Sequence, residues 1–363
     1  MTRFPFLDWM RGLAVVIMIQ CHVFNSLTRL DARHSAVYIF TQFVGGMAAP
    51  LFLFMAGMTT GFLMDRLEAR GLTPLRRWLV ALKRAGYLFV IAYLFRFTNT
   101  LFAWNFAAFL KVDILNCMGL AMAVFSAAAM WDSARRVRGA IAVAVLIAIL
   151  APVVSGFDWS RTPAVLHYYI APGPDRAQFP FFPCAAYLGF GIAAGSLVKS
   201  ADKADSPGHL DSLMRWLFLT AMGTFLAAEY FSNLPFSIYA ASDFWRSSPG
   251  LIFIRLAIML AMLAGAYLWT EYLARPGWSW MQTLGKASLL VYWVHVMLVY
   301  GITAEPWKRS LAPAGSALAA LTVLVCMIAL AEARLRKFRW NGNARYLQPG
   351  PRARGARAHA AAK

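Results

Sequence analysis

Long apolar runs separated by short polar stretches extend along most of this 363-residue chain. A helix that crosses a membrane needs roughly 20 consecutive, mostly apolar residues. Segments of this kind cover residues 7–27, 36–64, 78–97, 112–131, 138–157, 179–198, 213–232, 251–273, 282–303 and 313–334. The pattern therefore predicts an all-α, polytopic membrane bundle of about ten transmembrane helices, forming a single domain over residues 1–334.

Two of these segments have internal features that refine the prediction. The second is the longest and contains several glycines and Pro50, so we expect a kink or tilt around Pro50. The first already contains Asp8 and Arg11, and no small-residue cleavage site follows it. We therefore expect a retained first helix and not a signal peptide.

Composition supports the membrane assignment. Hydrophobic residues make up 60% of the chain, charged residues 14%, and the mean hydropathy is +0.56. An ordinary soluble domain has fewer apolar and more charged residues. A disordered chain carries far less apolar surface. Both classes are thus excluded, and a formal net charge of +19 remains to be explained.

The positive charge follows the predicted loops. If the N-terminus is cytoplasmic, 25 of the 35 Lys and Arg residues fall on the cytoplasmic side and 10 on the other. The positive-inside rule then predicts a multi-pass protein of the inner (plasma) membrane with both termini in the cytoplasm. The basic, aperiodic segment 335–363 is expected to be a disordered cytoplasmic tail near anionic lipid, and nucleic acid is not an expected partner.

The first polar cluster lies in the first predicted helix. Asp8 and Arg11 are three residues apart, and His22 follows Arg11 by eleven. At about 100° per residue, this spacing returns to within roughly 20° of the same helix face, about 16 Å along the axis. Gln20 lies near the histidine. Such a stripe suits a substrate whose anionic groups enter near Arg11 and which reacts deeper, although helix-end charges and one hydrogen-bonded histidine would give the same pattern.

The second cluster lies in the ninth predicted span. Ser288, Tyr292 and His295 occupy positions i, i+4 and i+7 and therefore one face of a helix. A serine or tyrosine in a membrane helix commonly makes an interhelical hydrogen bond or anchors the interface. His295 is harder to explain in this way.

The third cluster opens the fourth span. Asp113 and Asn116 share a helix face, and Lys111 or Arg96 would neutralise the carboxylate. An ion pair at the membrane boundary explains this arrangement. The functional interpretation is a carboxylate that orients a histidine base from a neighbouring helix.

The fourth cluster is basic and precedes the third span. Arg76, Arg77, Lys83 and Arg84 are dense enough to bind phosphates, and Arg84 lies where the helix enters the membrane. Topology determination alone explains most of this density.

Several remaining residues carry less information. Glu229 and Arg255, near the outer ends of neighbouring spans, are expected to pair with each other or to contact an external substrate. The four cysteines lack the CxxC and CxH spacings, so neither a disulfide framework nor a metal site is expected.

The order of the motifs resembles a known family. The Arg-x10-His spacing from Arg11 to His22 is similar to the opening of the type 3 integral-membrane acyltransferases. The chain more closely resembles bacterial members of the heparan-α-glucosaminide N-acetyltransferase catalytic-domain family. The resemblance covers residues 4–300 and rests on LDWMRGLAVVIMIQCHVFN, APLFLFMAGMTTGF, VDILNCMGLAM, QFPFFPCAAYLGFGIAAGSL and LGKASLLVYWVH.

This resemblance implies ten or eleven transmembrane helices and an acyltransferase. The donor would be acyl-CoA, most simply acetyl-CoA, reached from the cytoplasm, and the acceptor a sugar hydroxyl or amine of a glycan or envelope molecule across the membrane. By the resemblance, His22 is the acyltransferase histidine and Arg11 its companion. The catalytic histidine of the heparan branch lies further along, before the second span, so His34 is the alternative.

Thioester chemistry suggests roles for the other candidates. A histidine would act as base or acyl carrier. Asn116, Gln20 or Tyr292 would donate to the oxyanion. The phosphates of coenzyme A would bind Arg11 and Arg84 together with Arg76 and Arg77.

Two further expectations concern partners and a competing function. Membrane lipids and a second copy of the chain, giving a homodimer, are expected partners. The competing function is a transporter or flippase for a small anionic or sugar-linked substrate, which broken helices in two corresponding positions would favour.

Overall fold

The computed structural model describes residues 4–103, 112–172, 179–203, 208–239, 242–275 and 277–340. These residues form helices joined by short connections, and no β-strand occurs among them. Within the described ranges, seven helices are long and apolar enough to cross a membrane, or eight if one bent pair forms a single span. The all-α, polytopic membrane bundle is therefore confirmed, while ten spans and the orientation of the termini stay predictions.

The chain divides into two compact units, the first drawn from residues 1–45 and 265–363. Its described elements, in chain order, are α1 (Pro5–Leu27), η1 (Leu30–His34), α2 (Ala36–Gly45), the π-helical η4 (Trp269–Leu273), α11 (Trp280–Lys286), α12 (Ser288–Tyr300), η5 (Ile302–Trp307) and α13 (Pro313–Trp340).

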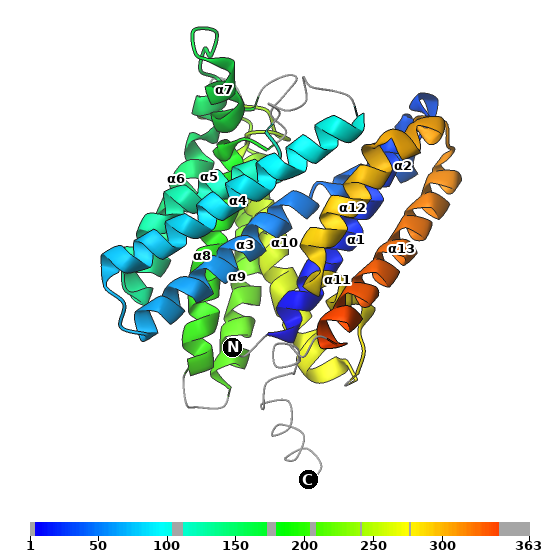
Figure 1. Ribbon diagram of the computed structural model, residues 1–363. Helices are drawn as coiled ribbons and strands as arrows, with labels where there is room; N and C mark the ends of the chain where they lie inside the picture. The colour runs from blue at the N-terminus through cyan, green and yellow to red at the C-terminus, as the bar shows by residue number, and fades with distance from the viewer. Residues whose placement is uncertain are drawn as a thin grey trace. The chain divides into compact units, whose positions relative to one another are not determined.

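Helix α1 is the centre of the first unit and packs on α11, α12 and α13 (Figure 1). Two glycines bring α1 and α11 together. A Cβ on Gly12 would collide with the carbonyl oxygen of Met281, and a Cβ on Gly285 with that of Asp8. Close backbone approach at small residues is the usual way in which membrane helices associate.

The predicted ninth span is broken. Helices α11 and α12 meet at 87°, with Ala287 between them. The apolar pattern predicts one straight helix over 282–303, because no proline or polar run marks the break. The Ser279 side chain caps the start of α11, and close backbone contact at Gly285 holds this short helix against α1, next to the bend.

The second unit comprises residues 46–264. Its described elements are α3 (Ala48–Ala69), α4 (Pro74–Ala103), α5 (Ile114–Phe125), η3 (Ser126–Met130), α6 (Ser133–Ser155), α7 (Ala164–Ile170), α8 (Phe181–Lys203), α9 (His209–Ser232) and most of α10 (Pro249–Leu268).

Helix α8 forms the core of the second unit, packed closely against α3 and α6 (Figure 1). Glycines line the contact with α3. A Cβ on Gly57 or Gly61 would strike the backbone of α8, and a Cβ on Gly191 or Gly195 the backbone of α3. The run of glycine, alanine and serine in α8 thus serves helix packing and leaves this helix almost entirely buried.

The second predicted segment is interrupted, and two other elements differ in length from the sequence prediction. Helix α2 ends at Gly45 and α3 begins at Ala48, so the interruption lies close to the kink expected around Pro50, which itself lies in the first turn of α3 where no N–H is needed. The fourth predicted span is short, with α5 and η3 together covering Ile114–Met130. Helix α13 continues to Trp340. The predicted tail beyond that point lies outside the described residues.

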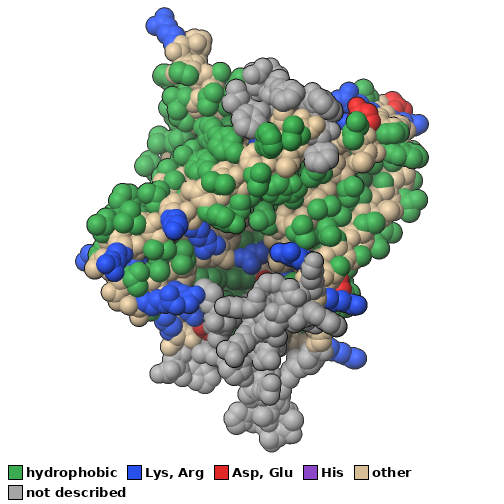
Figure 2. All heavy atoms as spheres, in the orientation of Figure 1, with side chains coloured by type: hydrophobic (Ala, Val, Ile, Leu, Met, Phe, Trp, Pro, Cys, Tyr) green, Lys and Arg blue, Asp and Glu red, His purple; other side chains and the backbone are tan. Residues whose placement is uncertain are grey.

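The surface agrees with a membrane environment. Hydrophobic side chains cover much of the visible face of the helices (Figure 2). Large apolar side chains are exposed on several helices, among them Phe40, Leu94, Trp216 and Phe231. In water such exposure is unfavourable. It is expected where lipid tails surround a helix, which supports a multi-pass membrane protein.

Candidate functional site

Two histidines from distant parts of the sequence meet in the first unit. His22 of α1 and His295 of α12 stack with an interplanar angle of 11° and ring centroids 5.2 Å apart. The Nδ1 atom of His22 lies 3.0 Å from the Nε2 atom of His295. His295 is fully buried, and His22 is partly exposed. Both were sequence candidates, but the pair itself was not predicted.

A backbone carbonyl fixes the direction of this hydrogen bond. The Nδ1 atom of His295 lies 2.7 Å from the carbonyl oxygen of Val291, which can only accept. In the neutral pair, Nδ1 of His295 therefore carries the proton and its Nε2 accepts from Nδ1–H of His22. The Nε2 atom of His22 then has a lone pair that the histidine pair does not use.

A tyrosine and an asparagine adjoin His22. The ring of Tyr300, the last residue of α12, lies 5.4 Å from the His22 ring at 66°. The Asn25 side-chain amide donates to the Tyr300 hydroxyl oxygen at 3.3 Å. Arg33 in turn donates to the Asn25 carbonyl at 2.7 Å and lies over the ring of Tyr38. Tyr300 was not among the residues predicted from the sequence, because it does not lie on the helix face shared by Ser288, Tyr292 and His295.

The charged end of the predicted stripe is also in the first unit. Asp8 is buried at the start of α1, and its carboxylate lies 3.5 Å from the guanidinium of Arg11, which is 25% exposed. The predicted Asp8–Arg11 pairing is thus confirmed, and Arg11 keeps an exposed part of its side chain.

Four other first-unit candidates make different contacts. The Gln20 amide donates to the Thr41 carbonyl at 3.2 Å and so ties α1 to α2. The Tyr292 ring lies 5.9 Å from that of His295. Ser288 is the first residue of α12. His34 is exposed at the end of η1.

Asp113 and Asn116 belong to the second unit and cap α5. The Asp113 carboxylate accepts from the backbone N–H groups of Leu115 at 3.0 Å and Asn116 at 3.1 Å. It also lies 3.2 Å from the guanidinium of Arg96, so this arginine neutralises it. Lys111, the other expected neutralising residue, lies outside the described residues. The capping role accounts for both side chains.

Asn116 also binds Tyr169 of α7, a helix outside the candidate membrane-spanning segments. Its amide donates to the Tyr169 hydroxyl at 2.9 Å, and that hydroxyl lies 2.9 Å from the hydroxyl of Tyr93. Burial and the contact with Tyr93 raise the pKa of Tyr169 above its ordinary value, so it stays a neutral phenol. The Asn116 amide, predicted as a donor to an oxyanion, therefore already donates to a protein hydroxyl.

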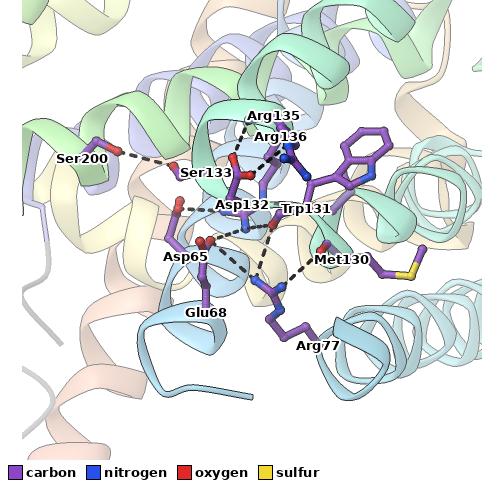
Figure 3. A network of polar contacts seen from close by, with 11 residues as sticks. Asp65, Glu68, Arg77, Met130, Trp131, Asp132, Ser133, Arg135, Arg136 and Ser200 are labelled. Atoms are coloured by element: carbon purple, nitrogen blue, oxygen red, sulfur yellow. Dashed lines mark hydrogen bonds and ion pairs between the residues drawn. The ribbon is translucent and has the colours of Figure 1, made fainter. Parts of the chain in front are cut away.

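The basic cluster separates into exposed and buried members. Arg76 and Arg84 are exposed on α4. Arg77 is buried, donates to the carbonyls of Met130 at 3.1 Å and Trp131 at 3.4 Å, and lies 3.6 Å from Glu68. These contacts hold the start of α4 to η3 and to the end of α3 (Figure 3). Arg77 is therefore engaged within the protein, while the side chains of Arg76 and Arg84 are exposed.

Beside Arg77 lies the most deeply buried cation of the described chain. Arg136 of α6 has no exposed surface and lies 2.7 Å from both Asp65 and Glu68 of α3. Its guanidinium also donates to the carbonyl oxygens of Ala128 and Trp131. Figure 3 shows this network joining α3, η3 and α6. Its charge pairing explains how Arg136 tolerates full burial.

Within the described residues, no group of three or more His, Cys, Asp or Glu side chains could hold a metal ion. The four cysteines are free thiols. The histidine pair is thus the arrangement best suited to chemistry. A neutral imidazole with an available nitrogen, oriented by a second residue, is the usual form of a general base or a nucleophile.

Comparison with known families identifies one family whose model matches more than half of the chain. The family model described as "Heparan-alpha-glucosaminide N-acetyltransferase, catalytic" matches residues 3–231. The match includes His22, Arg11, Asp113 and Asn116, and it ends before the helix that carries His295. No curated protein matches the chain significantly.

Proposed function

Because the chain belongs to the heparan-α-glucosaminide N-acetyltransferase catalytic family, we propose that it is a membrane acyltransferase that uses acyl-CoA. The acyl group, acetyl in the simplest case, moves from the donor at the cytoplasmic face to an amine or hydroxyl of a sugar-containing acceptor across the membrane. The membership itself supports a transferase within a multi-pass membrane protein.

The His22–His295 hydrogen bond carries this proposal. Nε2 of His22 takes the proton from the acceptor as its nitrogen or oxygen attacks the thioester carbonyl carbon. The carbon–sulfur bond then breaks, coenzyme A leaves as a thiolate, and the proton on His22 passes to it. The Val291 carbonyl, acting through His295, keeps Nδ1 of His22 protonated and Nε2 available as the base.

Tyr300 is the best placed donor to the thioester oxyanion. Its oxygen accepts from Asn25, and among the described residues no acceptor for its own proton is seen. A hydroxyl so oriented beside His22 can donate to the oxygen that gains charge in the transition state. Gln20 and Asn116 are weaker candidates because their amides already donate to Thr41 and Tyr169.

Three arginines are proposed, each separately, as phosphate ligands of coenzyme A: Arg11 of the first unit, and Arg76 and Arg84 on α4. Guanidinium groups bind phosphate oxygens through two parallel hydrogen bonds. Arg11 and Arg84 lie in different units, and the proposal requires only that each is accessible, as its exposure indicates.

Transport or flipping of a sugar-linked or anionic substrate is the second candidate function. The 87° bend at Ala287 and the interruption between Gly45 and Ala48 support it, because discontinuous membrane helices commonly surround transported substrates. A transporter would move its substrate without breaking the thioester.

Liposomes containing the purified protein test the proposal. Acetyl-CoA labelled in the acetyl group is supplied on one side and a glucosamine-terminated glycan on the other. We expect labelled glycan and free coenzyme A with the wild type, and neither with His22→Ala. His209→Ala, which changes an exposed histidine at the start of α9, is the matched control. Full activity of His22→Ala would refute the assignment, and loss with His34→Ala alone would move the site to His34.

A further inference from the structure

Arg255 is a cation at membrane depth outside the histidine site. It lies on α10, six residues after Pro249, which corresponds to about 9 Å along the helix. Among the described residues, no carboxylate forms an ion pair with it. The expected partner, Glu229, instead accepts from the Asn233 side chain at 3.2 Å. A charge placed in a membrane helix without a counter-charge is costly and is commonly functional.

A buried hydroxyl faces the same region. Tyr187 of α8 is 2% exposed, and its hydroxyl has no hydrogen-bond partner among the described residues. It lies close enough to Arg255 to interact with its guanidinium. Leaving such a group without a partner costs free energy, so an unpaired hydroxyl of this kind needs an explanation.

The two side chains lie on neighbouring helices. Tyr187 is three residues before Phe190 on α8, and Arg255 is two residues after Phe253 on α10. The rings of Phe190 and Phe253, 6.1 Å apart, show that these helices face each other.

Two thiols complete the surroundings. Cys184, one turn before Tyr187 on α8, also interacts with Arg255. Cys117 of α5 contacts Cys184 in turn. Thiols make these surroundings less polar than water, and the carboxylate of Asp113, which interacts with Cys117, is already paired with Arg96. A charge-assisted hydrogen bond is stronger in such an environment.

We propose that Arg255, Tyr187 and Cys184 form a binding site for an oxyanion, a phosphate or carboxylate group, at membrane depth. One anionic oxygen would neutralise Arg255 and accept from the unpaired hydroxyl of Tyr187. The ligand is either a small free anion or the headgroup of a lipid whose chains lie along α8 and α10. The site is independent of acyl transfer, because it requires nothing of the histidine pair.

Thermal unfolding of the full-length protein in a nonionic detergent tests the site. The probes are inorganic phosphate and dihexanoyl phosphatidic acid, with sodium chloride at matched ionic strength as the salt control. We expect a saturable rise in the unfolding temperature with a phosphate probe but not with chloride. Arg255→Gln is expected to weaken apparent binding about tenfold or more, since it removes a charged hydrogen-bond donor.

Tyr187→Phe gives a second, milder test. Because no acceptor for its hydroxyl proton occurs among the described residues, the unliganded variant is expected to be as stable as the wild type, and only the phosphate-induced shift is reduced. Arg246→Gln is the matched control, since Arg246 is an exposed arginine paired with Asp243 before α10. A much larger rise in unfolding temperature with phosphatidic acid than with phosphate would identify a lipid headgroup as the ligand. Equal rises would identify a small free anion.

Three outcomes would overturn the proposal. The first is a wild type that neither phosphate probe stabilises beyond the salt control. The second is an equal shift in Arg255→Gln and in the wild type. The third is a loss of stability in unliganded Tyr187→Phe, which would mean that the hydroxyl has a structural partner. If Arg255→Gln does not fold, Tyr187→Phe decides between the proposal and its refutation.

Discussion

The Nδ1 atom of His22 lies 3.0 Å from the Nε2 atom of His295, and the Val291 carbonyl fixes the direction of that hydrogen bond. The two rings are separated by more than 270 residues in sequence but belong to one unit. A backbone carbonyl cannot reverse its role, so the Val291 carbonyl and the contact between α1 and α12 together set the proton positions of both neutral imidazoles.

Replacing His295 by alanine should abolish most of the activity while leaving donor binding intact. Without an acceptor for its Nδ1 proton, His22 is free to adopt the tautomer in which Nε2 is protonated and cannot act as a base. We expect kcat to fall by about 10²–10⁴-fold, with little change in the KM for acyl-CoA. Steady-state kinetics of the reconstituted protein measure both. A large rise in that KM with an unchanged kcat would contradict the assignment.

Tyr300→Phe should lower kcat without unfolding the protein. The variant keeps the ring against His22 and removes only the hydroxyl that Asn25 orients. Loss of one oxyanion donor commonly costs about 10²–10³-fold in kcat. Tyr230→Phe, at an exposed position on α9, is the matched control. Equal kcat values for the two variants would exclude Tyr300 as an oxyanion donor.

Arg136→Leu should destabilise the second unit strongly. It leaves Asp65 and Glu68 without their shared cation, and breaking a buried pair from one side costs about 3–5 kcal/mol. Arg135→Leu, at the neighbouring residue whose side chain is 73% exposed, should change stability by about 0.5 kcal/mol or less. Thermal unfolding in detergent compares the stabilities of the two variants. Removing both carboxylates as well, with Asp65→Asn and Glu68→Gln, should restore part of the loss.

The all-α membrane class follows from the apolar pattern, because a helix that crosses a bilayer needs about 20 consecutive, mostly apolar residues, and such runs are visible in a sequence. His22 and His295 are recognisable for a related reason, since polar groups are conspicuous in apolar helices. Their contact depends on how α1 packs against α12, and helix periodicity carries no information about which helices meet.

Other differences arise from short-range geometry. The bend at Ala287 depends on close contact at Gly285, and nothing in the local sequence distinguishes this glycine from others in apolar helices. Arg77 looks like a phosphate ligand in a basic cluster, yet its contacts with Met130 and Trp131 bury it. Such contacts involve backbone carbonyls, which a sequence does not display.

Asp132 should make the stability of α6 depend on pH. As the helix cap it accepts from the backbone N–H of Arg135 at 2.8 Å, and this hydrogen bond, with the nearby Arg135 charge, lowers the pKa of Asp132 below its ordinary value. Because the folded pKa is depressed, the stabilisation is present above the ordinary carboxyl pKa and is lost as pH falls through the folded value.

The pH dependence of thermal unfolding measures this contribution. The stability difference between the wild type and Asp132→Asn should narrow as the pH falls below the ordinary pKa of an aspartate. Asp158→Asn, which changes another carboxylate outside the membrane-spanning segments, serves for comparison because a backbone hydrogen bond from Ser160 also lowers the pKa of Asp158. A difference that stays constant with pH would show that the charge of Asp132 contributes nothing.

Gly285→Ala should destabilise the first unit and reduce activity together. The added Cβ would collide with the Asp8 carbonyl oxygen. Because a backbone atom cannot rotate away, α11 must move off α1, at a cost of about 1–3 kcal/mol. Helix α12, which carries His295, follows directly after α11, so the displacement should also disturb the histidine pair.

Gly223→Ala on α9 is the control for Gly285→Ala, since its Cβ would meet nothing within 4 Å and alanine favours a helix by about 0.5–1 kcal/mol. Opposite shifts in unfolding temperature are thus expected, and equal shifts would contradict the close α1–α11 contact.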